Sequence, residues 1–259
     1  MWEEISAHMY RNYIITKRWP GELANIFVYP LIGLLSVGIF AFFMTMQGAP
    51  ASSLVFVFVG VVAWEFFNTS LRVMGYGVAE DIWNNCMKHT HIGSSRTPHF
   101  MAGHGIWGII AAMTDLVLVT VLGYIIFGIN FYQAGLVMLP ALAGLFLFGI
   151  GIGMLVNSLI ITKGTKTMAL LWIVPGIVMV FSGVYYPAEI MPAPFNYLTL
   201  ALPSTYLISA LRSAMLTGGF LWTEIVLGLA VSAAIFILGI FVMNKAILKG
   251  KENGVLSKF

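Results

Sequence analysis

Three ionisable side chains lie within long apolar runs of the sequence: Glu65, Arg72 and Asp115. In a membrane, a charge near the middle of a helix costs roughly 2.5–3.5 kcal/mol on insertion scales, so such residues pair inside the protein or line a solute path. Glu65 and Arg72 are seven residues apart. On a helix this spacing places them about 10 Å apart along the axis, on nearly the same face. Structural pairing between helices and a place in a substrate path or gate both fit this pattern.

Metal, nucleotide and acyl-transfer chemistry are not predicted. The single cysteine, Cys86, excludes an internal disulfide framework, and it is followed by His89, His91, His99 and His104. Cys86 and His89 have helical i, i+3 spacing, but there is no paired Cys-x-x-Cys or His-Glu-x-x-His arrangement. The sequence also lacks the G-x-x-x-x-G-K-[ST] phosphate loop and the G-x-S-x-G nucleophile motif. We therefore predict no catalytic residue, no metal site and no cofactor bound by this chain.

The elements that must position the charged residues are membrane-spanning helices. The 259 residues are 59% apolar and only 9% charged, so the bilayer is the expected solvent. This composition predicts an all-α polytopic membrane protein whose residues 1–259 form a single transmembrane domain. The six predicted spans lie at residues 22–46, 54–78, 101–127, 134–161, 167–184 and 221–244.

Basic residues predict the orientation of these spans. Of the 13 Lys and Arg residues, 11 fall in alternate connecting segments: Arg11, Lys17, Arg18, Lys88, Arg96, Lys163, Lys166, Lys245, Lys249, Lys251 and Lys258. Segments 47–53 and 128–133 contain none, and 185–219 contains only Arg212. By the positive-inside rule both termini are cytoplasmic, in what we expect to be a prokaryotic inner or plasma membrane. The first apolar run is too long for a signal peptide core of about 7–15 residues, so we expect it to be retained.

Residues 1–20 are predicted to form an amphipathic helix at the inner membrane surface, which Pro20 and Gly21 end. Its apolar residues recur on one face at three- and four-residue spacing: Trp2, Ile5, Met9 and Tyr13. A plain membrane anchor and an elbow that also contacts a cytoplasmic partner are both consistent with this pattern.

Residues 79–100 form the one long internal connection on the cytoplasmic side. We expect a short helix lying across the membrane surface, with an exposed aromatic side chain that docks a partner. The candidate docking residues are Glu80, Asp81, Ile82, Trp83 and Lys88.

Residues 185–219 are too apolar for a solvated linker, yet four prolines prevent one continuous helix: Pro187, Pro192, Pro194 and Pro203. The spacing predicts a helix over 195–202 that Pro203 ends, and a second helix over 205–216 capped by Ser204. Backbone that turns inside hydrocarbon must be buried in protein or line a wet cavity. The sequence therefore predicts an external re-entrant hairpin of two short helices before the last span, with the character of a gate.

Several motifs together resemble those of permease subunits of type-2 ATP-binding-cassette exporters. That family includes capsule, O-antigen and teichoic-acid exporters and many drug or lipid exporters. The matching residues are Phe181-Ser182-Gly183-Val184-Tyr185-Tyr186-Pro187, Pro203-Ser204-Thr205-Tyr206, Ala210-Leu211-Arg212, Gly60-x-x-x-Trp64-x-Phe66-Phe67 and Thr97-Pro98 with Gly103. Leu202 stands where the family has Asn, and segment 79–100 lacks the usual E-x-x-x-G-T/E-x-L run.

The resemblance implies a dimer of two permease copies, a homodimer by expectation, above two separate ATPase subunits that hold ATP and Mg. ATP-driven closure would act on residues 79–100 and 1–19, and the spans would open a path outward. The implied substrate path contains Glu65, Phe66, Phe67, Arg72, Met179 and Phe181, and the implied external gate contains Tyr185, Tyr186, Pro187, Pro203, Tyr206 and Arg212. No nucleic-acid partner is expected, and membrane lipids surround the chain.

The main alternative is a self-contained secondary transporter or channel. Interrupted spans at matching positions of two repeats would favour it, and the sequence has only one such hairpin. The substrate stays open between a lipid-linked glycan, a phospholipid-like molecule and a hydrophobic drug. The aromatic, charge-poor path fits all three, and the second-span pattern leans towards a glycan or lipid.

Overall fold

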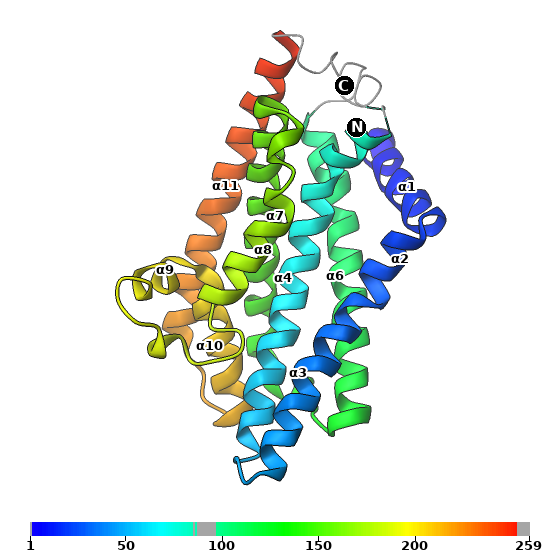
Figure 1. Ribbon diagram of the computed structural model, residues 1–259. Helices are drawn as coiled ribbons and strands as arrows, with labels where there is room; N and C mark the ends of the chain where they lie inside the picture. Colours follow the sequence, from blue (N-terminus) through cyan, green and yellow to red (C-terminus); the bar gives the residue numbers. More distant parts are fainter. Residues whose placement is uncertain (1, 85, 87–96, 253–259) are drawn as a thin grey trace.

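A computed structural model describes residues 2–84, 86 and 97–252 of the chain, and all regular secondary structure in these ranges is helical (Figure 1). Within them, five helices are long and apolar enough to cross a membrane: Pro20–Met46, Ser52–Trp83, Thr97–Phe127, Phe131–Lys163 and Trp222–Glu252. The chain is therefore an all-helical, multi-pass membrane protein, as its composition predicts.

The described elements, in chain order, are α1 (Trp2–Arg18), α2 (Pro20–Phe27), α3 (Tyr29–Met46), α4 (Ser52–Trp83), α6 (Thr97–Phe127), η1 (Phe131–Val137), α7 (Met138–Lys163), η2 (Thr165–Thr167), α8 (Leu170–Phe181), η3 (Ala188–Ile190), α9 (Asn196–Ala201), α10 (Pro203–Leu216) and α11 (Trp222–Glu252).

The N-terminal helix is present as α1 and ends at Arg18, two residues before Pro20, and Pro20 and Gly21 open the next helix, α2. Its protein-facing side differs from the predicted apolar face. Ile5, His8 and Asn12 are buried, and α1 packs on α6. Trp2 and Tyr13 remain exposed. Interior contacts thus use a face offset from the one defined by apolar spacing, which leaves the aromatic side chains free for lipid or headgroups.

The second span is longer than its predicted range of 54–78. Helix α4 continues to Trp83, and α6 already begins at Thr97. The predicted connection at 79–100 is wrong at both ends, because its first residues complete α4 and its last residues open α6. Nothing in residues 79–83 breaks a helix, since they contain neither Gly nor Pro.

The fifth predicted span, 167–184, is shorter in the structure. Helix α8 has 12 residues, and together with the preceding turn it gives one apolar stretch over Thr165–Phe181. Pro175 lies inside α8 without ending it. The helix ends at Ser182 and Gly183, where Gly183 adopts a positive φ of 65°. At 1.5 Å per residue, α8 covers about 18 Å, less than the roughly 30 Å of a hydrocarbon core.

The two short helices predicted after α8 are both present as α9 and α10. The predicted cap of the second one is wrong. Pro203 occupies the first helical turn and extended Leu202 is the N-cap, without a side-chain hydrogen bond. Ser204 is instead inside the helix, where its hydroxyl meets that of Ser182 at 2.5 Å. Pro203 sets this boundary because its missing N–H and fixed φ suit the first helical position.

Helix α7 is the central element of the bundle, packed between α4 and α11. A Cβ added to Gly149 or Gly153 would lie 2.7 and 2.8 Å from backbone oxygens of α4. Gly151 faces α11 in the same way, with Phe236 Cα at 3.0 Å. These glycines form a small-residue face of α7, since only glycine allows the backbones to approach so closely.

The ends of the bundle separate the basic segments from the others. The start of α1, the end of α11, the end of α4 and the start of α6 lie at one end, together with the turn from α7 to α8 (Figure 1). The turns from α3 to α4 and from α6 to η1 lie at the opposite end (Figure 1). The described lysines and arginines outside the bundle interior fall on α1, on the α7–α8 turn and at the end of α11. We refer to this as the basic end.

Candidate functional site

A cavity of about 410 Å³ opens between α3, α4 and α8. It contains three of the predicted path residues: Glu65, Arg72 and Met179. Its other lining residues are mainly aromatic or amide side chains: Asn25, Tyr29, Trp64, Asn68, Tyr76, Trp172 and Tyr185, with Ile32, Gly33, Leu171, Pro175 and Gly176. The cavity can thus accommodate an apolar or aromatic group beside a few polar ones, as ligand sites commonly do.

Polar contacts tie this cavity to the helices around it. A Cβ on Gly33 would lie 2.8 Å from Glu65 Oε1, so the buried carboxylate lies directly against α3. Arg72 Nη2 donates to the Asn25 carbonyl oxygen at 3.0 Å and lies 3.4 Å from the hydroxyl of Thr69. That hydroxyl donates to the carboxylate of Asp115 on α6. The three ionisable residues therefore belong to one region that joins α2, α3, α4 and α6.

Phe66 and Phe67 do not line this cavity. Both are buried in the interior, at 3% and 1% exposure, and Phe67 stacks on Phe148 of α7 at 4.8 Å between ring centroids. Successive residues of a helix point in different directions, so the neighbours of Glu65 face the packed core. Phe181 lies at the end of α8, where it stacks on Phe195 at 6.0 Å.

Arg212 fastens the segment after α8 to α4. Its guanidinium is nearly buried, at 7% exposure, and donates to three backbone carbonyls. The acceptors are Phe56 at 3.0 Å, Gly183 at 2.7 Å and Val184 at 2.6 Å. The guanidinium also lies 3.5 Å from the centroid of the Phe56 ring. Charge-assisted hydrogen bonds and a cation–π contact therefore compensate the burial of this cation. We call this arrangement the Arg212 clasp.

Arginine stays protonated at neutral pH, so the buried guanidinium keeps its charge. Since the clasp depends on a planar fork with donors in several directions, lysine is a poor replacement at this position.

Gly60 provides the space for the clasp. A Cβ at this position would lie 2.0 Å from the carbonyl oxygen of Val184 and 2.6 Å from Arg212 Nη2. The hydrogen bond between Ser182 and Ser204 closes the same junction from α10. In the sequence, Gly60 belongs to the Gly60-x-x-x-Trp64-x-Phe66-Phe67 motif, which predicts no partner for it. Its contact with residues more than 120 positions away has no local signal.

The predicted gate residues separate into different surroundings. Pro187, Tyr206 and Arg212 line a cavity of about 580 Å³ beside α9 and α10, together with hydroxyl side chains and Glu224. Tyr185 lines the cavity between α3, α4 and α8 instead. The hydroxyl of Tyr186 donates to the Val180 carbonyl, and Pro203 is buried at the start of α10. The gate residues thus lie around the junction of α8 with the hairpin rather than at one point.

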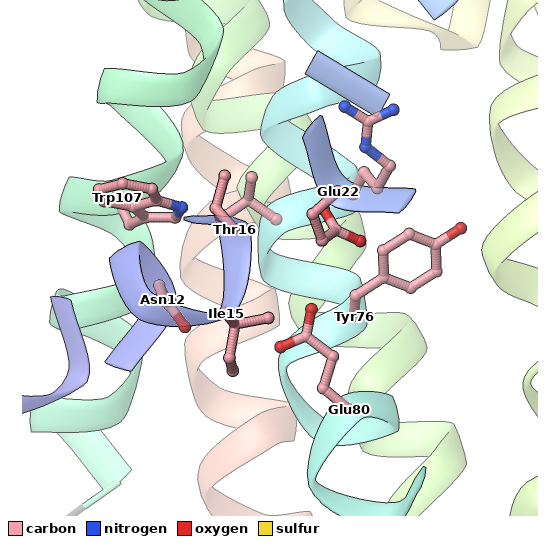
Figure 2. Close-up of a pocket in the computed structure, with 9 residues that line it drawn as sticks. Asn12, Ile15, Thr16, Glu22, Tyr76, Glu80 and Trp107 are labelled. Carbon is pink, nitrogen blue, oxygen red and sulfur yellow. The ribbon is translucent and has the colours of Figure 1, made fainter. Parts of the chain in front are cut away.

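At the basic end, Glu80 and Asp81 face inward. Asp81 has no exposed surface and accepts a hydrogen bond from Arg11 of α1. Figure 2 shows Glu80 with Tyr76 and Glu22 around one small space, which α1 closes with Asn12. The space is about 20 Å³, enough for roughly one water molecule. Asp81 therefore ties α1 to α4, and neither Glu80 nor Asp81 forms an exposed docking surface.

Of the other candidate docking residues, Trp83 is 48% exposed at the end of α4, and Ile82 beside it is partly buried. Lys88, His89 and His91 lie outside the described residues.

His99 pairs with Glu4, and the Nδ1 of His104 lies 3.1 Å from the Phe100 carbonyl. Within the described ranges, no group of three or more His, Cys, Asp and Glu side chains has the geometry to hold a metal ion.

Comparison of the sequence with models of known protein families finds no match, and no curated protein matches it significantly.

Proposed function

We propose that this chain is the membrane-spanning permease subunit of an ATP-driven exporter of the type-2 ATP-binding-cassette class. The observation that carries the proposal is the Arg212 clasp. It brings together residues of three separate motifs on which the resemblance rests: Gly60, the Ser182-Gly183-Val184 segment and Arg212. Motifs that matched by chance would have no reason to meet at one junction.

In this proposal the chain crosses the membrane six times, with both termini in the cytoplasm of a prokaryotic cell. Helix α8 and the re-entrant hairpin that follows it make the fifth crossing, and α1 lies along the inner membrane surface. Two copies associate, and each contributes the cavity that contains Glu65 and Arg72 to a path for a lipid-linked glycan, a lipid or an amphipathic drug. ATP and Mg bind to separate ATPase subunits, whose nucleotide-dependent states favour one conformation of the permease over the other.

The ATPase subunit is proposed to dock at the basic end, on the exposed side chain of Trp83 and the connection that follows it. Co-expression of the chain with candidate ATPases, followed by purification in detergent, tests this docking. We expect one ATPase to co-purify in stoichiometric amounts and to be lost from the Ile82→Ala, Trp83→Ala double variant. Exposed Trp222 serves as the control, since Trp222→Ala removes a side chain of the same kind from the start of α11, away from the basic end. Export that persists after every candidate ATPase is removed would overturn the proposal.

Glu65 is expected to matter for export more than for folding. Its carboxylate lines the cavity, so Glu65→Ala changes the polarity of the proposed path. We expect export to fall about tenfold, equivalent to about 1.4 kcal/mol, while the amount of protein in the membrane changes by less than about twofold. Ile237→Ala, at a 65% exposed position on α11, is the control. If export and membrane accumulation fall in parallel, Glu65 has a structural role instead.

A further inference from the structure

A second apolar groove lies on another side of the bundle, between α6 and α11. Its volume is about 410 Å³. The deepest lining residues, Met74, Ile150 and Met154, are at most 2% exposed and form its floor. Met101 and Gly105 of α6 form part of one wall, and α11 forms the other, where the lining side chains are half-buried. The groove is therefore open to the surroundings of the bundle along its length.

The lining positions give the groove an elongated shape. On α11 they are Phe236, Ile240 and Asn244, and on α7 they recur with the same four-residue spacing. Eight residues of helix correspond to about 12 Å along the axis. The groove thus runs parallel to the helices. Phe236 lies at the end towards the middle of the bundle, and Asn244 lies at the opposite end, close to the basic end.

The side chains that line the groove suit a thin, flexible apolar occupant. Three of the lining residues are methionines, Met74, Met101 and Met154, whose unbranched side chains adapt to mobile apolar partners. A Cβ on Gly105 would have no atom within 4 Å, so the wall is open at that point.

The charges near Asn244, at the end of the groove close to the basic end, indicate which polar group the occupant carries. Asn244 is the one polar residue among those that line the groove, and Lys245 follows it. Lys251 lies seven residues after Asn244, on nearly the same face of α11 and about 10 Å nearer the end of that helix. Both lysines are exposed; Lys245 Nζ lies 4.3 Å from the centroid of the Phe241 ring on the same helix, and flexible side chains of this length can reach a headgroup at the membrane surface. A negatively charged headgroup complements this end of the groove.

We propose that the groove between α6 and α11 binds one acyl chain of an anionic phospholipid, with the phosphate held near Asn244, Lys245 and Lys251. The apolar groove lies on helices long enough to cross a membrane, and its polar end coincides with the basic end. The lipid orientation that follows has its tail towards the middle of the membrane and its headgroup at the surface. This site is separate from the cavity beside Glu65, and it does not depend on the proposed export function.

Native mass spectrometry of the delipidated protein tests the proposal with two lipids that carry the same oleoyl chains, phosphatidylglycerol and phosphatidylcholine. We expect one phosphatidylglycerol per chain, bound about tenfold more tightly than phosphatidylcholine. Gly105→Leu should fill the groove and weaken binding of both lipids about tenfold. Gly21→Leu, at an equally open position on α2 that lines neither the groove nor the cavity beside Glu65, should leave both unchanged. The double variant Lys245→Gln, Lys251→Gln should remove the preference for phosphatidylglycerol.

Equal lipid binding by the wild type, Gly105→Leu and Gly21→Leu would overturn the proposal, as would equal affinity of the wild type for both lipids. A second measurement does not depend on the folding of any variant. A phosphatidylglycerol with a photoreactive group on its acyl chain should label the wild-type peptides that contain Met101 and Ile240. Labelling confined to other surfaces, or retention of a hydrophobic small molecule in place of lipid, would also contradict it.

Discussion

Gly60→Ala lowers the melting temperature of the detergent-solubilised protein by about 6 °C or more. The added methyl group would lie 2.0 Å from the Val184 carbonyl oxygen, which is backbone that cannot rotate away. To relieve the overlap, the segment after α8 must move off α4, and the clasp lengthens. Overpacking of this kind costs about 3 kcal/mol, and each kcal/mol lowers the melting temperature of a chain of this size by roughly 2–4 °C.

Gly105→Ala is the matched control, because Gly105 is also inside a long helix but its Cβ would have no atom within 4 Å. Alanine favours helix by up to about 1 kcal/mol relative to glycine, so this variant should be neutral or slightly more stable. Thermal unfolding followed by circular dichroism or dye binding measures both variants. Equal melting temperatures of Gly60→Ala and Gly105→Ala would mean that the close contact between α4 and the hairpin segment is absent in the membrane protein.

Arg212→Met should cause a loss of similar or larger size. It leaves three buried carbonyls, those of Phe56, Gly183 and Val184, without their donor. Hydrogen bonds from a charged group contribute about 1.5–3 kcal/mol each, and their sum is less than additive, so we expect a loss on the order of 4 kcal/mol. Membrane accumulation of the variant should fall, and limited proteolysis should cleave first between α8 and α10.

Two further variants separate the geometry of the clasp from its charge. Arg212→Lys keeps the charge but cannot reach three carbonyls at once, so it should be intermediate between wild type and Arg212→Met. Glu189→Gln removes the exposed carboxylate that lies near the guanidinium, and its stability should stay within about 0.5 kcal/mol of wild type. Wild-type stability of Arg212→Lys would show that charge, and not the fork of donors, holds the hairpin.

Much of the architecture could be predicted from the order of the residues. Apolar runs long enough to cross a bilayer identified the long helices, because hydrocarbon requires every backbone polar group to be bonded within the segment. Proline positions marked the break before α2 and the boundary between α9 and α10. Each of these features depends on local backbone chemistry or on length.

The side of each helix that faces the protein was decided by tertiary packing. Helices surrounded by lipid can be apolar on all sides, so periodicity does not distinguish the interior face from the lipid face. For this reason nothing in the sequence separated Phe66 and Phe67 from the substrate path that the family resemblance implies. The fold instead buries both side chains, and Phe67 stacks on Phe148 of α7. Asp81 is a second example. As part of the acidic pair Glu80-Asp81 it was predicted to belong to a docking surface, but the position of α1 places Arg11 beside it as a hydrogen-bond donor.

The Arg212 clasp shows the same division within one site. The sequence by itself determined that Arg212, the Ser182-Gly183 pair and Gly60 occur within motifs that resemble those of the exporter permeases. Only the folded chain decided that they meet, because α10 and the end of α8 must both lie on α4 before three carbonyls converge on one guanidinium. A hydrogen-bond donor can be read from a residue's type, but its acceptors are backbone groups common to every residue. Their identity is therefore fixed by tertiary structure alone.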